Sequence, residues 1–331
     1  MRDLATEFEA ERDHLTAVAY RMLGSRAEAE DVVQETWLRY AVALATPQAR
    51  AEVRDLRAWL TTTASRLCLD VLRSARVRRE AYPGAWLPEP IVDRVVNPAD
   101  QVGPAGGQTG GAAGLAADPA ERTVRAEQVG IALLVLLERL SPEQRVAFVL
   151  HDVFAVPFPA IATALGTSPA AARQLAARAR RAVSEGGARQ SADPAEHRRL
   201  LDAFLAAAEA GDLDRLLAVL APDVVYVGDG GGIFPTARRP VTGADKVARF
   251  ALGLVQRSTA TWQVRHLRSV PVLVNGFPGV QIAADYRPGL PLHGVLWCTV
   301  ADGRITGLYQ QVNPEKLTRV PPLHPSDAPA P

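Results

Sequence analysis

The chain has 331 residues, a formal net charge of +1 and 48% hydrophobic residues, so two or three domains with real cores are expected. Because the whole chain is not basic, any nucleic-acid surface has to be local. Cys68 and Cys298 form no metal or redox spacing, and the longest apolar run, residues 131–137, is too short to span a bilayer. We therefore expect a cytoplasmic protein with no signal peptide, no metal, no cofactor and no membrane contact.

Residues 1–82 are predicted to be wholly helical. An amphipathic pattern opens at Phe8 and breaks at Gly24, and Ser25 can cap the helix that follows. That second helix has an inward apolar stripe and a polar, net acidic outer face. The outer face carries Asp31, Gln34, Glu35 and Leu38. A face of this kind is often only solvated, and the residues alone leave that interpretation open.

A third helix is predicted from about Leu56 to Arg79, after a loop that contains Pro47. Its second half is rich in arginine and poor in acidic residues. The candidate DNA-contacting residues on this helix are Arg66, Arg73, Arg76 and Arg78. A cluster of charged residues usually forms only a solvent-exposed surface. A second basic helix further along the chain favours contact with a DNA backbone.

Residues 83–121 are punctuated by proline, and residues 103–117 are mostly glycine and alanine, which is typical of a mobile tether. Inside this linker an apolar pair is expected to be exposed, as in a docking peptide. The segment reads Trp86, Leu87, Pro88, Glu89 and Pro90. The alternative is that Trp86 packs back on the preceding helix.

Residues 122–188 are predicted to hold one lead-in helix followed by three short helices over 141–183. Ser141 can cap the first short helix, with Gln144 placed to close a capping box. Pro159 can open the second, and Gly166 can end it. A short turn followed by a basic helix is the layout of a helix-turn-helix, although a structural hairpin with solvated arginines has the same pattern.

The third short helix has an apolar stripe and a basic outer side. Arginines can bind phosphates or guanine edges, and glutamine can bind adenine. The candidate DNA-contacting positions on this outer side are Ala170, Arg173, Gln174, Ala177, Arg178, Arg180 and Arg181.

Residues 194–320 read as two helices, a strand, a helix and four strands, which predicts an α+β domain with one sheet curled around a conical pocket. Residues 321–331 are a tail. The side chains considered for the pocket are Tyr226, Asp229, Asp285, His293, Trp297 and Tyr309. The glycines that follow Asp229 suggest a tight turn with positive φ.

Several stretches carry a family resemblance. The sequence LGSRAEAEDVVQETWLRY, with the arginine-rich helix after it, resembles region two of the extracytoplasmic-function sigma factors, and residues 141–183 resemble their region four. The third domain resembles the SnoaL-like branch of the NTF2-like fold. GDGGG at 228–232, NPEKL at 313–317 and AWLPEP resemble signature segments of one subgroup of these sigma factors. The implied fold is multidomain: a region-two helical bundle and a region-four helix-turn-helix, both all-α, plus an α+β cone domain.

The resemblance implies a transcription initiation factor that binds core RNA polymerase and promoter DNA. Carried over by position, Asp31, Gln34, Glu35 and Leu38 would bind the β′ clamp helices, and region four would meet the β flap. Residues about 46 to 66 would read the −10 element, and the helix-turn-helix would read the −35 element. Its recognition positions would be Ser168, Ala170, Arg173, Gln174, Ala177 and Arg178. Arg66 stands where many members have Asn, and Phe158-Pro159-Ala160 replaces the usual Tyr-Glu-Glu, so the promoter sequence stays open.

The resemblance also implies that the third domain takes the place of a separate anti-sigma protein, with a pocket that could hold a small ligand. The residues expected to act in this regulation between domains are Trp86, Leu87, Pro88, Glu89, Pro90, Asp229, Gly230, Gly231, Gly232, Asn313, Pro314 and Lys316. Two other functions remain as alternatives: a ligand-sensing helix-turn-helix regulator, and a SnoaL-like cyclase or isomerase. For the enzyme, the resemblance would make Asp229 or Asp285 the general acid or base.

Overall fold

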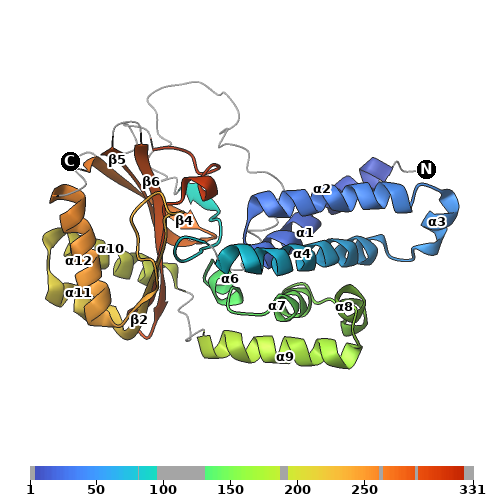
Figure 1. Cartoon of the computed structure of the whole chain (residues 1–331). Coiled ribbons are helices and arrows are strands. Elements are labelled where there is room, and N and C mark those ends of the chain that lie inside the picture. The colour runs from blue at the N-terminus through green and yellow to red at the C-terminus, as the bar shows by residue number, and fades with distance from the viewer. Residues whose placement is uncertain are drawn as a thin grey trace, which may run out of the picture. The chain divides into compact units, whose positions relative to one another are not determined.

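The computed structural model describes residues 4–80, 82–94, 131–186, 193–260, 264–287 and 290–323. These residues form two compact units (Figure 1). Of the described residues, the first unit holds those within Met1–Tyr82, Trp86–Glu89 and 131–186, and the second holds Pro83–Ala85, 90–94 and those from 193 to 323. No helix of the described segments is long and apolar enough to cross a membrane.

The N-terminal part of the first unit has four helices. They are α1 (Leu4–Leu23), α2 (Arg26–Ala43), α3 (Pro47–Glu52) and α4 (Leu56–Glu80). Ser25 caps α2 as predicted, because its side chain accepts a hydrogen bond from the backbone N–H of Glu28. The apolar stripes of α1, α2 and α4 meet in a core that includes Leu15, Tyr40 and Leu60.

The loop predicted around Pro47 is in fact helix α3. Thr46 caps this helix by accepting a hydrogen bond from the backbone N–H of Ala49, and Pro47 lies in its first turn. The prediction treated proline as a loop signal, whereas proline is well tolerated in a first helical turn because its missing N–H would be unpaired there anyway.

The C-terminal part of the first unit contains α6 (Ile131–Leu137), α7 (Pro142–Phe148), a π-helical turn η2 (Val149–Val153), α8 (Phe158–Leu165) and α9 (Pro169–Gly186). The predicted capping box is confirmed, since Ser141 and Gln144 each bond the backbone N–H of the other. Gly166 ends α8 in the left-handed conformation with φ of 64°. The turn between α8 and α9 is therefore that of a helix-turn-helix.

A buried arginine ties the two parts of the first unit together. The Arg145 guanidinium donates to the carbonyls of Leu137 and Met22 at 3.0 Å each, and to the carboxylate of Glu138 at 2.6 Å. Arg145 is only 3% exposed, so these acceptors satisfy a charge that would be costly to bury alone. Helix α4 also packs against α7 and α8.

The second unit is a sheet covered on one face by helices, as the sequence predicts (Figure 1). Its helices are α10 (Pro194–Ala210), α11 (Leu213–Val219), α12 (Ala244–Ala260) and the 3₁₀ turn η3 (Pro314–Lys316). The strands after α11 are β2 (Leu220–Asp229), β3 (Val241–Thr242), β4 (Arg265–Val274), β5 (Phe277–Arg287), β6 (Leu290–Ala301) and β7 (Arg304–Gln311).

The strand order is β1-β4-β5-β6-β7-β2-β3, with β2 parallel to β7 and the remaining neighbours antiparallel. The core lies between this sheet and the helices, and Leu201, Leu216 and Leu308 are fully buried in it. Asp302 and Gly303 turn the chain between β6 and β7 with φ of 50° and 71°, the positive values that a tight hairpin turn requires.

The linker supplies the edge strand β1 (Val92–Arg94), which the sequence analysis missed. β1 pairs antiparallel with β4, Val92 opposite Val274 and Arg94 opposite Val272. Around Ile91, the backbone N–H donates to the side chain of Asn275 at 3.0 Å and the carbonyl accepts from its backbone N–H at 2.7 Å.

The predicted mobile tether is therefore wrong for residues 87–94, because Leu87, Glu89 and Ile91 are buried and the residues of β1 pair with β4. The glycine-rich part of the linker and the predicted start of the lead-in helix lie outside the described residues.

Candidate functional site

Helix α2 presents an outer face with both acidic and apolar side chains. Asp31 and Gln34 are exposed, while Glu35 is half-exposed and bonds Arg39 at 2.9 Å. Leu38 and Val42 are 52% and 81% exposed and lie one helical turn apart, so they place apolar area side by side on this surface. We call these five residues, Asp31, Gln34, Glu35, Leu38 and Val42, the α2 outer face.

The opposite side of α2 explains why this face points outward. Val32, Val33 and Thr36 are buried against α1 and α4, and the Tyr40 hydroxyl donates to Glu7 at 2.9 Å. The sequence analysis did not include Val42 in the candidate set. Its position, four residues after Leu38 and on the same side of the helix, is the signal that could have identified it.

Helix α9 separates a buried alanine stripe from a basic outer side. Ala172, Ala176 and Ala179 are buried, and the Ser168 side chain caps the helix by accepting from the backbone N–H of Ala171 at 3.2 Å. Ala177 is half-buried. The remaining candidates on this helix and at its cap are exposed: Ser168, Ala170, Arg173, Gln174, Arg178 and Arg181. Hydrogen-bond donors therefore cover the outer side of α9.

Two contacts orient α9 on the rest of its module. The Arg173 guanidinium lies 5.1 Å from the centre of the Phe158 ring, a cation–π contact with the first turn of α8. Arg180 donates to Asp152 at 2.6 Å, which joins α9 to the π-helical turn. This ion pair between Arg180 and Asp152 helps to hold α9 against the rest of the module.

The candidate arginines of α4 contact the helix-turn-helix module. Arg66 donates to the carbonyl of Thr163 at 2.8 Å, and Arg73 donates twice to Glu143, at 3.0 and 3.1 Å. Burial disfavours ionised Glu143, but a backbone hydrogen bond and Arg73 outweigh burial, so the pKa of this carboxyl lies below its usual range. Arg76 and Arg78 lie on α4, and their side chains are outside the described residues.

Linker residues 86–89 bind the turn between α1 and α2. The Glu89 backbone N–H donates to Gly24 at 2.8 Å, its carboxylate accepts from the backbone N–H of Arg26 at 2.7 Å, and its carbonyl accepts from the Tyr20 hydroxyl at 2.8 Å. The carboxylate thus binds the first backbone N–H of α2, where negative charge is favourable.

The expectation of an exposed apolar pair in the linker is wrong. Leu87 is fully buried, and Trp86 is half-buried. The Trp86 ring lies beside Gly24, where a Cβ in place of the glycine hydrogen would come within 3.0 Å of it. The tryptophan therefore packs on the α1–α2 turn, where the glycine leaves room for the ring.

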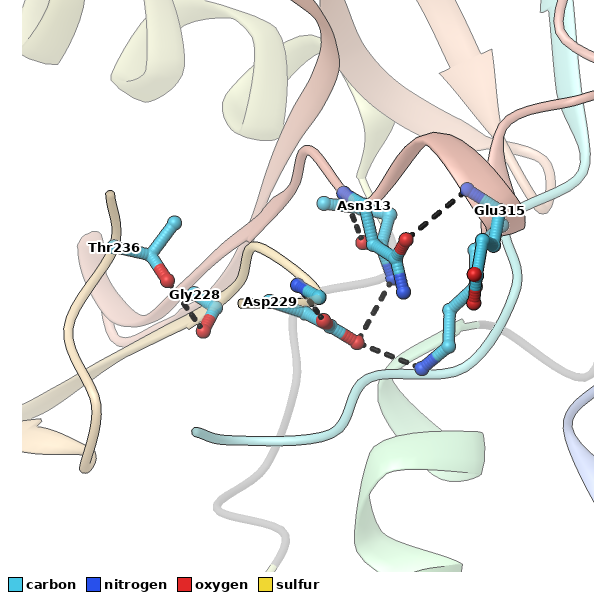
Figure 2. Close-up of polar contacts among 8 residues, drawn as sticks. Gly228, Asp229, Thr236, Asn313 and Glu315 are labelled. Carbon is cyan, nitrogen blue, oxygen red and sulfur yellow. Dashed lines mark hydrogen bonds and ion pairs between the residues drawn. The ribbon is translucent and has the colours of Figure 1, made fainter. Parts of the chain in front are cut away.

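The segments around Asp229 and Asn313 are joined by hydrogen bonds and an ion pair within the second unit, as Figure 2 shows. The Asp229 carboxylate is fully buried and accepts from Lys316 at 2.7 Å, from Gln311 at 3.3 Å and from the backbone N–H of Gly231 at 3.1 Å. Asn313 caps η3 by accepting from the backbone N–H of Glu315 at 3.0 Å. This arrangement is a satisfied structural cluster.

The glycines after Asp229 are required by close approach as well as by conformation. Gly231 and Gly232 have φ of 59° and 74°, which confirms the predicted positive-φ turn. A Cβ on Gly231 would lie 2.6 Å from the Asn313 side chain, and one on Gly232 would lie 2.9 Å from Pro83. Any larger residue would therefore separate this loop from η3 or from the linker.

A cavity of about 220 Å³ lies in the second unit among side chains of α10, α12 and the sheet. Tyr226 lines it, as predicted. The five other residues expected there do not line it: Asp229, Asp285, His293, Trp297 and Tyr309. Successive side chains of a strand point to opposite faces, and the paired residues Trp297 and Tyr309 lie on the face away from this cavity.

The two carboxylates proposed for acid–base chemistry are therefore separated from the cavity. Asp285 is exposed and bonds His266 at 2.7 Å, while Asp229 is engaged with Lys316. His293 contacts the side-chain amide of Gln281 at 2.7 Å. Among the described residues, no group of three potential metal ligands comes together.

Comparison with known proteins gives three family matches along the chain. Residues 8–78 match Sigma-70 region 2, residues 131–183 match Sigma-70 region 4, and residues 201–308 match the SnoaL-like domain. The chain is 47% identical over 324 residues to the ECF RNA polymerase sigma factor SigJ of Mycobacterium tuberculosis, covering 96% of this chain and 94% of the relative.

Two further comparisons extend over nearly the whole length. A probable ECF RNA polymerase sigma factor of the same species, SigI, is 36% identical over 314 residues, covering 95% of this chain and 94% of SigI. The crystal structure of Mycobacterium tuberculosis SigJ aligns with a TM-score of 0.69 at 44% identity, covering 95% of this chain and 98% of that chain. The protein belongs to the family of ECF RNA polymerase sigma factors, with a SnoaL-like domain at its C-terminal end.

Proposed function

We propose that the protein binds core RNA polymerase in the cytoplasm and directs it to promoters, where transcription begins. The observation that carries this proposal is that both sigma modules occur in one chain, each with an exposed face suited to its partner. The face is acidic and apolar on α2 and basic on α9. Both faces are exposed and lie outside the cores of their modules, which supports a role in binding partners.

The α2 outer face is proposed to bind the β′ clamp helices of the polymerase. Leu38 and Val42 supply apolar area that a protein partner can bury, and Asp31 and Glu35 supply charge at its margin. Apolar residues at the centre of an interface and charges at its rim are the usual division between affinity and steering. Region four is proposed to meet the β flap.

The DNA contacts are proposed for three parts of the chain. Helix α9 enters the major groove of the −35 element, with Arg173, Gln174 and Arg178 toward the base edges. Residues about 46 to 66 read the −10 element. The arginines of α4 bind the DNA backbone beside it, because guanidinium groups pair well with phosphates.

Binding of DNA by α4 requires a rearrangement within the first unit. Arg66 and Arg73 donate to Thr163 and Glu143 of the helix-turn-helix module, so these bonds have to break before the arginines reach phosphates. Exposed pairs of this kind contribute about 0 to 1 kcal/mol each. We infer a closed form that polymerase binding converts to an open form by separating the two modules.

The SnoaL-like domain is proposed to regulate this opening and not to catalyse a reaction. Its cavity is separated from the carboxylates considered for catalysis. The chain that binds the start of α2 through Glu89 continues, after two residues, into strand β1 of the SnoaL-like sheet. A gap of about 1 to 3 kcal/mol between the closed and open forms would change activity roughly 5- to 150-fold.

The proposed function is tested by selection of promoter fragments with the full chain, in the presence and absence of core RNA polymerase. We expect a specific set of fragments to be retained only when polymerase is present, because the two modules are held together in its absence. Specific retention by the chain alone would instead identify a ligand-sensing helix-turn-helix regulator and would contradict the proposal.

A further inference from the structure

The cavity of the SnoaL-like domain has an almost wholly apolar lining. Side chains from α10 and α12 form one side, and side chains from the central strands form the other. Among the lining residues are Phe204, Ala251, Leu254, Ile282, Leu296 and Leu308. At about 220 Å³ the cavity is smaller than the roughly 300 to 1,000 Å³ typical of sites for drug-sized ligands, so it suits a molecule of one or two rings.

The polar groups of this cavity are few and uncharged. The Tyr226 hydroxyl donates to the side-chain oxygen of Gln310, and both residues line the cavity. The Tyr226 oxygen can still accept a hydrogen bond, and the Gln310 amide can still donate one. Burial raises the pKa of Tyr226, which keeps its hydroxyl neutral.

The remaining lining excludes a charged ligand. No Asp, Glu, His, Lys or Arg is among the described residues that line the cavity. A carboxylate or ammonium would lose its hydration there without gaining an opposite charge, which is costly for an unpaired ion. A neutral ligand avoids this cost.

One wall of the cavity is shared with the linker. Phe234 and Tyr286 pack edge to face with ring centres 5.4 Å apart, and both line the apolar cavity. The same two residues also line a second, more polar cavity together with Pro83 and Gly84 of the linker. Phe234 comes shortly after the glycines at 230–232, and Gly232 lies close to Pro83 of the linker. A molecule that displaces this aromatic pair therefore acts on residues that contact the linker.

We propose that this cavity binds a neutral, largely apolar small molecule with one hydrogen-bonding oxygen, held by Tyr226 and Gln310. Its occupancy is transmitted through Phe234 and Tyr286 to linker residues 83–94. The proposal goes beyond the sigma function, and its test contains neither polymerase nor DNA, so the two can fail separately.

The first arm of the test measures binding to the full chain by calorimetry with three probes of one ring system: 2-naphthol, naphthalene and 2-naphthoate. We expect saturable one-to-one binding of 2-naphthol, with at least about tenfold weaker binding of the charged 2-naphthoate, a difference of about 1.4 kcal/mol. Equal affinity of 2-naphthol and 2-naphthoate, or no saturable binding of 2-naphthol, would overturn the proposal.

Variants locate the probe. Ala251→Leu fills the cavity and should abolish 2-naphthol binding, whereas Ala218→Leu, on the exposed side of α11, should leave it unchanged. Tyr226→Phe should weaken the binding of 2-naphthol about tenfold and leave the binding of naphthalene unaffected. This variant also tests the assignment if Ala251→Leu does not fold. Binding that neither lining variant alters would place the probe elsewhere and refute the assignment.

The second arm measures hydrogen exchange of the linker amides from Gly84 to Arg94, with and without saturating 2-naphthol. We expect exchange in this segment to change at least about twofold in the wild-type chain and not in Ala251→Leu. Binding without any change in this segment would refute the transmission to the linker.

Discussion

The Nζ atom of Lys316 lies 2.7 Å from Oδ2 of Asp229, a carboxylate that is fully buried in the SnoaL-like domain. Lys316 itself is 14% exposed. These residues belong to the two segments that resemble subgroup signatures, so the signatures meet as a structural pair. An isolated buried charge is costly, so each partner makes the burial of the other tolerable.

Lys316→Met should destabilise the SnoaL-like domain by about 3 to 5 kcal/mol, because it leaves the Asp229 carboxylate without its cation. Asp229→Asn should cost less, because it removes the buried charge itself and keeps a polar side chain. Urea unfolding of the full chain measures both. Lys246→Met, which removes an exposed lysine on α12, should have little effect; equal costs for Lys246→Met and Lys316→Met would contradict the prediction.

The first unit should lose stability as pH falls from about 6.5 to about 4. Burial, with the charges of Arg57 and Arg21, lowers the pKa of His14 to about 4. The unfolded chain therefore binds a proton on His14 in this window while the folded unit does not, and the folded form is disfavoured. His14 is half-buried and contacts Thr61 and Phe154.

Thermal unfolding between pH 4 and 7 checks this dependence. In His14→Gln, which retains a side chain able to bond Thr61, the melting temperature should fall less steeply across this window than in the wild type. Identical slopes for the two chains would show that His14 is not the group responsible.

Arg178→Ala should weaken promoter binding by the polymerase complex and lower its salt dependence by about one counterion, because an exposed arginine of α9 is proposed to contact DNA. Gln174→Ala should instead alter sequence preference and leave the salt dependence unchanged, because amides read base edges. Arg199→Ala, at an exposed position of α10, is the charge-matched control. A salt slope unchanged in Arg178→Ala would remove this residue from the interface.

Local chemistry made much of this fold predictable from the sequence. Ser141 and Gln144 form the expected capping box, and Gly166 ends α8 as expected, because caps depend on residues a few positions apart. The pattern of apolar and polar residues along residues 194–320 predicted the order of helices and strands in the SnoaL-like domain. These features need no knowledge of distant contacts.

What could not be predicted depends on contacts between distant residues. Strand β1 forms because Val92 pairs with the edge strand β4, about 180 residues further along the chain. Alternation along a strand does not say which set of side chains faces the helices, so Trp297 and Tyr309 were assigned to the wrong side of the sheet. The contact of Arg66 with Thr163 likewise joins elements that local patterns do not relate.

The most direct test of the account is promoter-dependent transcription by core polymerase with the full chain and with Asp31→Ala/Glu35→Ala. The exposed pair Asp202→Ala/Glu209→Ala on α10 removes the same charge elsewhere and serves as the control. We predict that the α2 variant loses polymerase binding and initiation together, while the control retains both. Undiminished initiation by the α2 variant, or no initiation by the unaltered chain, would contradict the account.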